Sequence, residues 1–420
     1  MKKKKLIDKI ADDIKRVAEE LDINPALITK AKYFSAEPKI SEWDIRKSGG
    51  FVAIRNAYFE LEDDGRDEAS YAEIADLRKA FRKLRKQAGS MDLMFNRIEE
   101  VVKTLPKINV KPYKAKPLKK GAKKDPRTVT VVLSDLHFGS DITEEEHGYS
   151  WGKTEEARAL ASVVKNVCNY KLEYRDQTEL VVNILGDIIE NELHGSNSTD
   201  YLHLQTCRAM WLLSQAISRF AENFKSVRVN FAVGNHGRDT SIHHSRATDM
   251  KFNALETTIY YGVKLACSKL PNVSFFQPKT AWTAYKAQGH NFYATHGDTH
   301  LNPGNPGNKI DIRGIEGQIN KINASLTDKD EYAVFMVGHV HHALATPMPN
   351  GTHLIVNGAL VPPNGYAQTL NIMESQQIQV LFETTPQHAV GDLRFINVTH
   401  SSKDKELDKI VKPFPGLDFT

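Results

Sequence analysis

The chain has 420 residues, of which 40% are hydrophobic and 26% charged, a balance that excludes a disordered or fibrous protein. Its three cysteines form no CxxC pair, which argues against a disulfide framework or a thiolate zinc site, and no apolar run is long enough to span a membrane. The length suggests two domains, and the cysteine usage suggests a cytoplasmic protein. The net charge of +4 divides into +10 for residues 1–127 and −6 for residues 128–420, so the N-terminal part is basic.

Residues 1–104 have the pattern of a small all-α N-terminal domain. Apolar residues recur at helical spacing from Leu6 to Leu21, and Asn24-Pro25 predicts the start of a second helix. Ser41 predicts the cap of a third helix, which Gly49-Gly50 separates from a helix over 51–61. Short helices joined by a glycine turn fit either a helix-turn-helix, with Arg55 and Asn56 as readers of bases, or a plain helical bundle.

A heptad pattern occupies residues 74–105. Its apolar positions alternate steps of three and four: Ile74, Leu77, Phe81, Leu84, Ala88, Met91, Phe95, Ile98, Val102 and Leu105. This pattern favours a coiled coil and a homodimer, while Gly89-Ser90 leaves open an antiparallel pair of helices.

Residues 105–127 form a basic linker with nine Lys and Arg residues and one acid. Such a segment suits the phosphate backbone of a nucleic acid, and the alternative is a solvated, extended linker.

The region 128–400 is predicted to be an α/β domain, followed by a C-terminal tail at 401–420. Buried strands are expected at 129–133, 180–185, 227–233, 291–295 and 332–337, with helices at 155–172 and 205–222 between them.

Side chains typical of metal ligands follow each of the five strands. The motifs, in chain order, are SDLHFG, GDIIEN, GNHGR, THGD and GHVHH, and they contain Asp135, His137, Asp187, Asn235, His236, His296, His339 and His341. One Asp-x-His is a weak signal, but five such motifs in order indicate a shared site. Oxygen and imidazole donors without thiolates suit Mn, with Fe, Zn or Mg as alternatives, and their number implies two divalent metal ions. Such a pair clamps a phosphate and lowers the pKa of a bridging water.

In these residues the chain resembles the calcineurin-like metallophosphoesterase superfamily, whose ordered motifs are DxH, GD, GNH, H and GHxH. The resemblance implies two β-sheets packed face to face with helices outside, and hydrolysis by a metal-bridging hydroxide. It assigns Asp135, His137, Asp187 and His341 to one ion, and Asn235, His296 and His339, with the shared Asp187, to the other.

The same resemblance makes His236 the group that contacts the phosphate and protonates the leaving oxygen; the alternative is a residue that only orients Asn235. Family members commonly place an acid directly after this histidine, whereas this chain has Gly237, and Asp239 is the nearby candidate to orient it. Arg238, Arg246 and His194 are candidates for substrate binding, or else belong to solvated loops.

The motifs predict a phosphoester hydrolase and leave its substrate open. The basic linker, the helix-turn-helix-like start and a loose resemblance to the nuclease subunits of double-strand-break repair favour a Mn-dependent DNA nuclease of phage-like type. The alternative is a phosphatase or phosphodiesterase of small or protein substrates, whose N-terminal region serves oligomerisation. A DNA-binding scaffold with a degenerate site is disfavoured by the complete ligand set.

Overall fold

The chain divides into two compact units, a smaller unit (Met1–Asp92) and a larger unit (Leu93–Thr420). The computed structural model describes residues 2–25, 28–36, 38–59, 110–170, 172–191, 201–237, 254–304, 310–363, 377–398 and 405–416. The predicted heptad at 74–105 lies outside these residues, so self-association through it stays a prediction. None of the described helices is long and apolar enough to cross a membrane.

The described part of the smaller unit is helical, as expected. It contains α1 (Lys2–Glu20), α2 (Lys30–Ser35), α3 (Glu42–Lys47) and α4 (Phe51–Tyr58). The apolar face of α1 packs against side chains of the other helices in one small core. Ser41 caps α3 by accepting a hydrogen bond from Asp44 N (3.2 Å), which confirms that helix start. The second helix begins only at Lys30, because Thr29 rather than Asn24 supplies the cap.

Asp13 joins three segments of the smaller unit. Its buried carboxylate accepts hydrogen bonds from Tyr33 Oη (2.7 Å) and Lys39 N (2.9 Å), and it pairs with Arg16 (2.8 Å). Burial alone would raise the pKa of Asp13, but these donors outweigh it and lower the pKa below its usual value.

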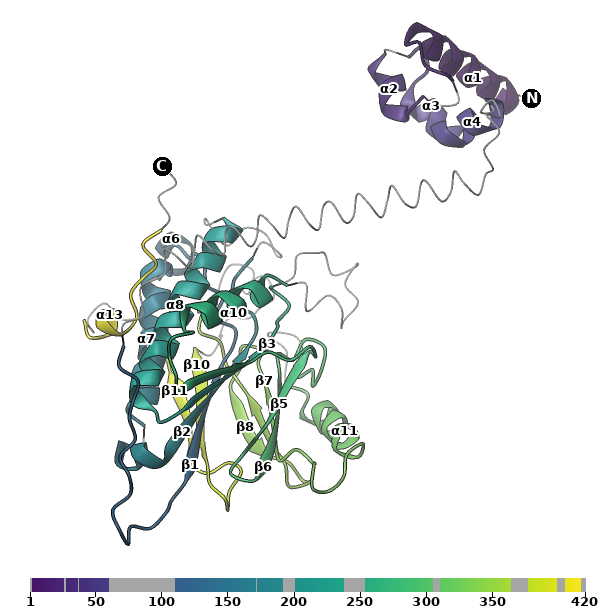
Figure 1. Ribbon diagram of the computed structural model, residues 1–420. Coiled ribbons are helices and arrows are strands. Elements are labelled where there is room, and N and C mark those ends of the chain that lie inside the picture. The colour runs from purple at the N-terminus through teal and green to yellow at the C-terminus, as the bar shows by residue number, and fades with distance from the viewer. Residues whose placement is uncertain are drawn as a thin grey trace. The chain divides into compact units, whose positions relative to one another are not determined.

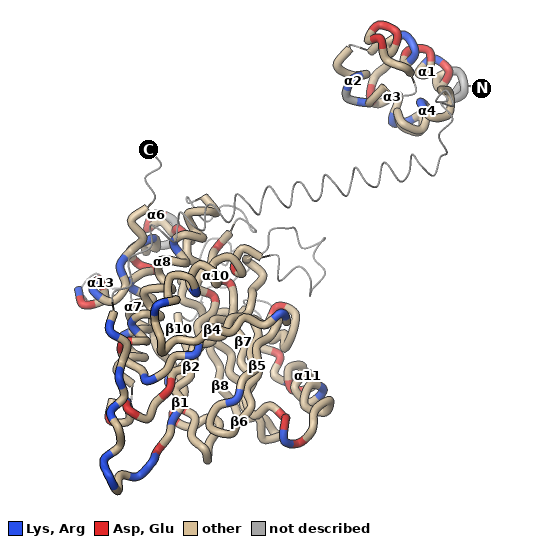
Figure 2. Tube along the Cα trace, in the orientation of Figure 1, with Lys and Arg blue, Asp and Glu red and all other residues tan. Residues whose placement is uncertain are grey.

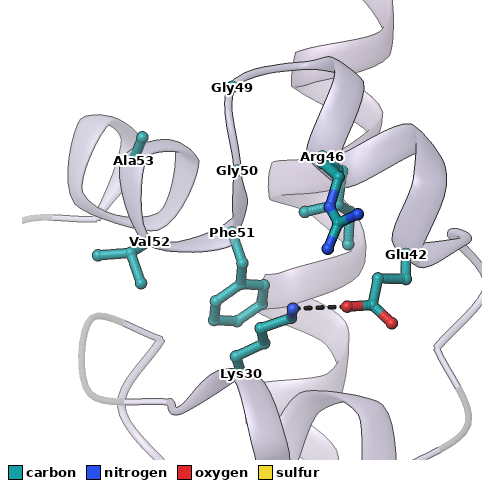
Figure 3. Close-up of a pocket in the computed structure, with 9 residues that line it drawn as sticks. Lys30, Glu42, Arg46, Gly49, Gly50, Phe51, Val52 and Ala53 are labelled. Atoms are coloured by element: carbon teal, nitrogen blue, oxygen red, sulfur yellow. Dashed lines mark hydrogen bonds and ion pairs between the residues drawn. The ribbon is translucent and has the colours of Figure 1, made fainter. Parts of the chain in front are cut away.

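A pocket of about 510 Å³ lies beside the glycine turn between α3 and α4 (Figure 3). The first turn of α4 forms one wall, and the ion pair between Lys30 and Glu42 (2.6 Å) lies at another.

Arg55 lies outside this pocket and is half-buried. Its guanidinium donates to Ile28 O (3.0 Å) and to Asn56 Oδ1 (2.8 Å). The two candidate readers of bases are therefore hydrogen-bonded to each other, and the choice between a helix-turn-helix and a helical bundle stays a prediction.

Two β-sheets form the centre of the larger unit. The six-stranded sheet has the order β11-β10-β1-β2-β3-β4 and the five-stranded sheet the order β5-β6-β7-β9-β8. The strands are β1 (Arg127–Leu133), β2 (Thr178–Leu185), β3 (Val227–Ala232), β4 (Val273–Phe276), β5 (Trp282–Ala287), β6 (His290–Thr295), β7 (Val334–Val337), β8 (Leu344–Pro347), β9 (His353–Val356), β10 (Ile378–Thr384) and β11 (Leu393–Asn397). All five predicted strands are present, as β1, β2, β3, β6 and β7.

The sheets and helices of the larger unit make four layers (Figure 1). Helices α7 (Lys153–Cys168), α8 (Leu202–Asn223) and α10 (Leu255–Ala266) cover the six-stranded sheet, and α11 (Ile312–Asn323) covers the five-stranded sheet. A separate apolar cluster, which includes Val132, Phe292 and Phe382, fills the space between the two sheets. Short segments α6 (Glu144–His147), η1 (Leu172–Gln177) and α13 (Leu407–Ile410) complete the described elements. This arrangement confirms the predicted fold class.

Residues 111–124 are exposed over most of their length and rich in lysine; we call them the basic strap (Figure 2). Hydrogen bonds hold the strap against the rest of the larger unit. Tyr113 Oη and Lys116 N both donate to Asp176 (2.6 and 2.7 Å), and Tyr113 N donates to Ala221 O (2.8 Å). It leads directly into β1 at Arg127. The described part of the predicted linker is therefore fixed to the domain that follows it.

The C-terminal segment is also part of the larger unit. Residues 401–420 were expected to be a tail, but Leu407, Val411 and Phe414 are buried in the core beneath α7 and α8. Trp211 Nε1 donates to Lys412 O (2.9 Å), and Arg158 on α7 pairs with Asp408 (2.8 Å). Apolar residues at this spacing are too few to predict burial from sequence alone.

Candidate metal centre

The five motif loops meet because of the strand directions. Strands β1, β2 and β3 are parallel neighbours in one sheet, and β6 and β7 are parallel neighbours in the other. Each motif follows the carboxyl end of its strand, so three loops from one sheet and two from the other converge at one end of the sandwich. Residues more than 200 positions apart thus become neighbours.

Asp135, His137 and His341 form one group of donor atoms. One donor atom from each lies within 4.8 Å of the others. His137 Nε2 lies 3.2 Å from His341 Nε2, and His341 Nε2 lies 3.5 Å from Asp135 Oδ1. We call this group subsite A.

Asp187, Asn235, His296 and His339 form a second group, subsite B. His296 Nε2 lies 3.1 Å from Asp187 Oδ2, 3.0 Å from Asn235 Oδ1 and 3.3 Å from His339 Nδ1. Asp187 also lies in a cluster with His137 of subsite A. The structure therefore brings together all seven residues that the resemblance assigned to two ions, with Asp187 between the groups.

The spacing of these atoms fits bound cations. Atoms bound to one ion at about 2.0–2.2 Å lie about 3 to 3.6 Å from one another, which is the range seen in both subsites. The Nε2 atoms of His137 and His341 face each other at 3.2 Å, so both could donate a lone pair to one ion. Oxygen and nitrogen donors without sulfur suit Mn, Fe or Zn.

Hydrogen bonds to the remaining ring nitrogens orient two of the histidines. His137 Nδ1 lies 2.9 Å from the buried carboxylate of Glu190, and His296 Nδ1 lies 2.8 Å from Leu185 O. With Nδ1 acting as the donor, Nε2 of each ring presents its lone pair to its subsite. Glu190 lies three residues after Asp187 in the GDIIEN motif but was not among the predicted site residues.

The charges of subsite B favour a cation. Burial opposes a charged imidazolium at His296, but the adjacent Asp187 carboxylate outweighs it and raises the pKa of His296 to about 10. At His339, burial and the positive charge of His296 lower the pKa to about 4. The buried carboxylate therefore stabilises positive charge at this position, which is the electrostatic requirement of a metal site.

The ligand loops have unusual backbone conformations. Asp135, His137, Asp187, His339 and His341 all have positive φ angles, between 47° and 74°. They are five of the nine such non-glycine residues in the described part of the chain. Conformations of this kind cost free energy and persist where the surroundings impose them, typically at functional sites.

Glycines in two motifs leave room for the carboxylates. A Cβ at Gly234 would lie 2.1 Å from Asp187 Oδ1, and one at Gly338 would lie 2.5 Å from Asp135 Oδ2. Neither glycine has a positive φ, so the close approach of a ligand side chain is the reason for glycine at these positions.

His236 lies beside both subsites and is 9% exposed. Its Nδ1 lies 2.7 Å from Glu190 O, and its backbone N donates to Asp187 Oδ1 (2.8 Å). Burial lowers the pKa of His236, but Asp187 and Glu190 outweigh it and raise the pKa above its usual value. The Glu190 carbonyl thus orients this ring through Nδ1.

Several candidate residues lie outside the described part of the chain. They are His194, Arg238, Arg246 and Asp239, so their contacts with substrate or with His236 stay predictions.

No family model and no curated protein matches the chain. Solved structures with a related chain path include a predicted phosphoesterase from Streptococcus pneumoniae (12% identity, TM-score 0.27, covering 64% of this chain and 98% of that one). A phosphopantetheinyl hydrolase from Mycobacterium tuberculosis (11%, 0.26, 64% and 100%) and a 5'-nucleotidase from Candida albicans (12%, 0.34, 68% and 59%) are also similar. Likeness at this level does not identify a function, which must be argued from the side chains.

Proposed function

We propose that this chain is a binuclear metal-dependent phosphoester hydrolase of the calcineurin-like metallophosphoesterase superfamily. The observation that supports it best is the convergence of seven donor side chains on two adjacent subsites that share Asp187. Asp135, His137, Asp187 and His341 would hold one ion, and Asp187, Asn235, His296 and His339 the other. Two bound divalent ions neutralise a phosphate and lower the pKa of a water between them.

His236 supplies the proton in this proposal. Because Glu190 O accepts the hydrogen bond from Nδ1, Nε2 is the nitrogen that donates to the leaving oxygen of the phosphoester. A divalent ion chelator should abolish activity, and Mn²⁺ should restore it.

We propose DNA as the substrate, which makes the enzyme a nuclease. The support is the basic strap, whose seven lysines between Lys111 and Lys124 form a run of positive charge fixed to the larger unit (Figure 2). Lysines in such a run bind phosphates and release counterions.

The position of the strap also supports the alternative, a phosphodiesterase or phosphatase of small or protein substrates. The strap enters β1 at its first residue, whereas Asp135 follows the last, and a seven-residue strand is about 20 Å long. The strap therefore does not line the metal subsites, so DNA would have to reach both regions.

One set of assays distinguishes the two substrates. The purified full chain with Mn²⁺ is given labelled duplex DNA, single-stranded DNA and a chromogenic phosphodiester. Cleavage of DNA supports the nuclease, and cleavage of the chromogenic compound alone supports the alternative. Failure to cleave any phosphoester, with metal bound, contradicts the proposed hydrolase.

A variant of the strap tests its role directly. Replacing Lys119, Lys120, Lys123 and Lys124 by Gln should weaken DNA binding. The slope of log affinity against log salt concentration should become shallower by about 0.9 for each lost phosphate contact. The matched control replaces four exposed lysines elsewhere in the larger unit, Lys279, Lys286, Lys321 and Lys329, and should bind DNA as before. Equal effects of both variants would mean that the strap is only a linker.

A further inference from the structure

The buried carboxylate of Glu256 contacts two of the ligand loops. Glu256 is the second residue of α10, and its side chain is fully buried. Oε1 accepts a hydrogen bond from Ile188 N (2.8 Å), and Oε2 accepts one from Gly234 N (2.8 Å). Ile188 directly follows Asp187, and Gly234 directly precedes Asn235, so one side chain holds the loops of two predicted ligands.

The side chain of Glu256 occupies the space beside Gly237, which follows the GNH motif. A Cβ at Gly237 would lie 2.6 Å from Glu256 Cγ, so a side chain at position 237 and the Glu256 side chain exclude each other. Family members commonly have an acid directly after the motif histidine, and this chain has Gly237 there. Leu255 N donates to Gly237 O (2.8 Å), which fixes the start of α10 against the same loop.

We propose that Glu256 is a positioning residue of the metal centre and occupies the space of the acid that Gly237 lacks. This inference rests on the proposed function, because it concerns the geometry of subsite B. The two carboxyl oxygens of Glu256 accept from one backbone amide each. Glu256 thereby sets the separation of the Asp187 and Asn235 loops.

Two contacts in the site depend on that separation. His236 N donates to Asp187 Oδ1 (2.8 Å) across the same two loops, and Asn235 Oδ1 lies 3.0 Å from His296 Nε2. If the loops moved apart, Asp187 would lose a hydrogen bond that orients its carboxylate, and Asn235 would leave the donor group. The expected effect is on metal affinity as well as on rate.

Two other helices hold neighbouring loops in a related way. Glu156 on α7 accepts from Gly139 N (3.0 Å), and Gln205 on α8 accepts from Asn191 N (2.8 Å). Each of these contacts reaches one loop. Among the three, Glu256 bonds to two loops, so its replacement should affect the site most.

The first test replaces Glu256 by Gln in the full chain. Glutamine has nearly the same shape but only one acceptor oxygen, so one of the two loops loses its partner. Isothermal titration with Mn²⁺ should show two ions in the wild type and about 10–100-fold weaker binding in Glu256→Gln, the usual effect of removing a group that orients ligands. Ile259→Val is the matched control: it shortens a buried side chain of the same helix and should bind Mn²⁺ as the wild type does.

The second test moves the acid to the family position. Glu256→Ala empties the space and should lose affinity, whereas the double variant Gly237→Asp with Glu256→Ala should recover part of it. Gly237→Asp alone should bind Mn²⁺ more weakly than the wild type, because two side chains then compete for one space. A helix residue that acted only by packing would not be replaced in this way.

The outcomes separate this inference from the proposed function. A wild-type protein that binds fewer than two Mn²⁺ ions overturns the proposed function itself. If the wild type binds two ions and Glu256→Gln binds them equally well, Glu256 does not position the site. Circular dichroism of each variant shows whether it is folded, and Glu256→Gln, as the closest isostere, decides if Glu256→Ala does not fold.

Discussion

Asp187 is the residue on which both subsites depend. We predict that Asp187→Asn abolishes hydrolysis and weakens the binding of both ions, because a neutral amide cannot replace a carboxylate that neutralises two cations. Metal stoichiometry and turnover of a chromogenic phosphodiester measure the two effects. Asp408→Asn, which changes a surface carboxylate paired with Arg158, is the control and should leave both unchanged. Near-normal turnover of Asp187→Asn would exclude the assigned site.

His236 is expected to act on rate rather than on metal binding. His236→Ala should retain both ions and lose on the order of 10²–10⁴ in kcat, the usual contribution of a general acid. In the wild type, activity should fall as pH rises through the pKa of His236, because the imidazolium is then lost, and His236→Ala should lack this decline. A pH–rate profile of both proteins checks this. Loss of metal in parallel with rate would show that His236 is a ligand or a support.

The ligand types and their order could be predicted from sequence because each motif directly follows a buried strand. Asp135 and His341 are far apart in the chain, but the alternation of strand and polar loop indicates that they meet. Glu256 could not be found in this way. Its role depends on where α10 packs, and no local pattern around residue 256 indicates which amides it will contact.

At the scale of elements, Asp13 links α1 to α2 and to the segment before α3. Its folded-state pKa is lowered, so the charged form stabilises the fold above the unfolded-state pKa, and this contribution is lost as pH falls through the folded-state value. We predict that Asp13→Asn lowers the stability of the smaller unit at pH 7 by about 1–3 kcal/mol, the range for hydrogen bonds to a charged group.

Hydrogen exchange of the α1 and α2 amides in the full chain measures this effect. The difference between variant and wild type should shrink at acidic pH, where Asp13 of the wild type is also neutral. Asp12→Asn, at an exposed neighbouring position, is the control and should exchange as the wild type does. A difference that stays constant with pH would contradict the electrostatic explanation.

The elements themselves were predictable to different degrees. Segments rich in β-branched and other apolar residues predicted β1, β2 and β3, whereas β8 and β9 have only four residues each. Thr29 competes with Asn24 as a cap, and sequence alone does not show which one begins a packed helix. Burial of Leu407 and Val411 likewise depends on packing against residues far away in the sequence.

At the scale of the whole molecule, the two units can be separated between Asp92 and Leu93. We predict that a chain beginning at Pro106, which also lacks the rest of the heptad, retains Mn²⁺ binding and hydrolysis of a small phosphodiester, because all the metal donors lie in the larger unit. If the heptad at 74–105 forms a dimer, the full chain should sediment as a dimer and the shortened chain as a monomer. A shortened chain that still sediments as a dimer would exclude the heptad as the interface.

The origin of the donors in both sheets has a consequence for the way the larger unit opens. Side chains of both sheets pack in one apolar layer, and Asn183 Nδ2 donates to Tyr285 Oη (3.1 Å) across it, so opening between the sheets has to break these contacts. Ions held by loops from both sheets would add a cross-link, so opening between the sheets would also have to release them. Saturating Mn²⁺ should therefore slow the hydrogen exchange of amides in both sheets together.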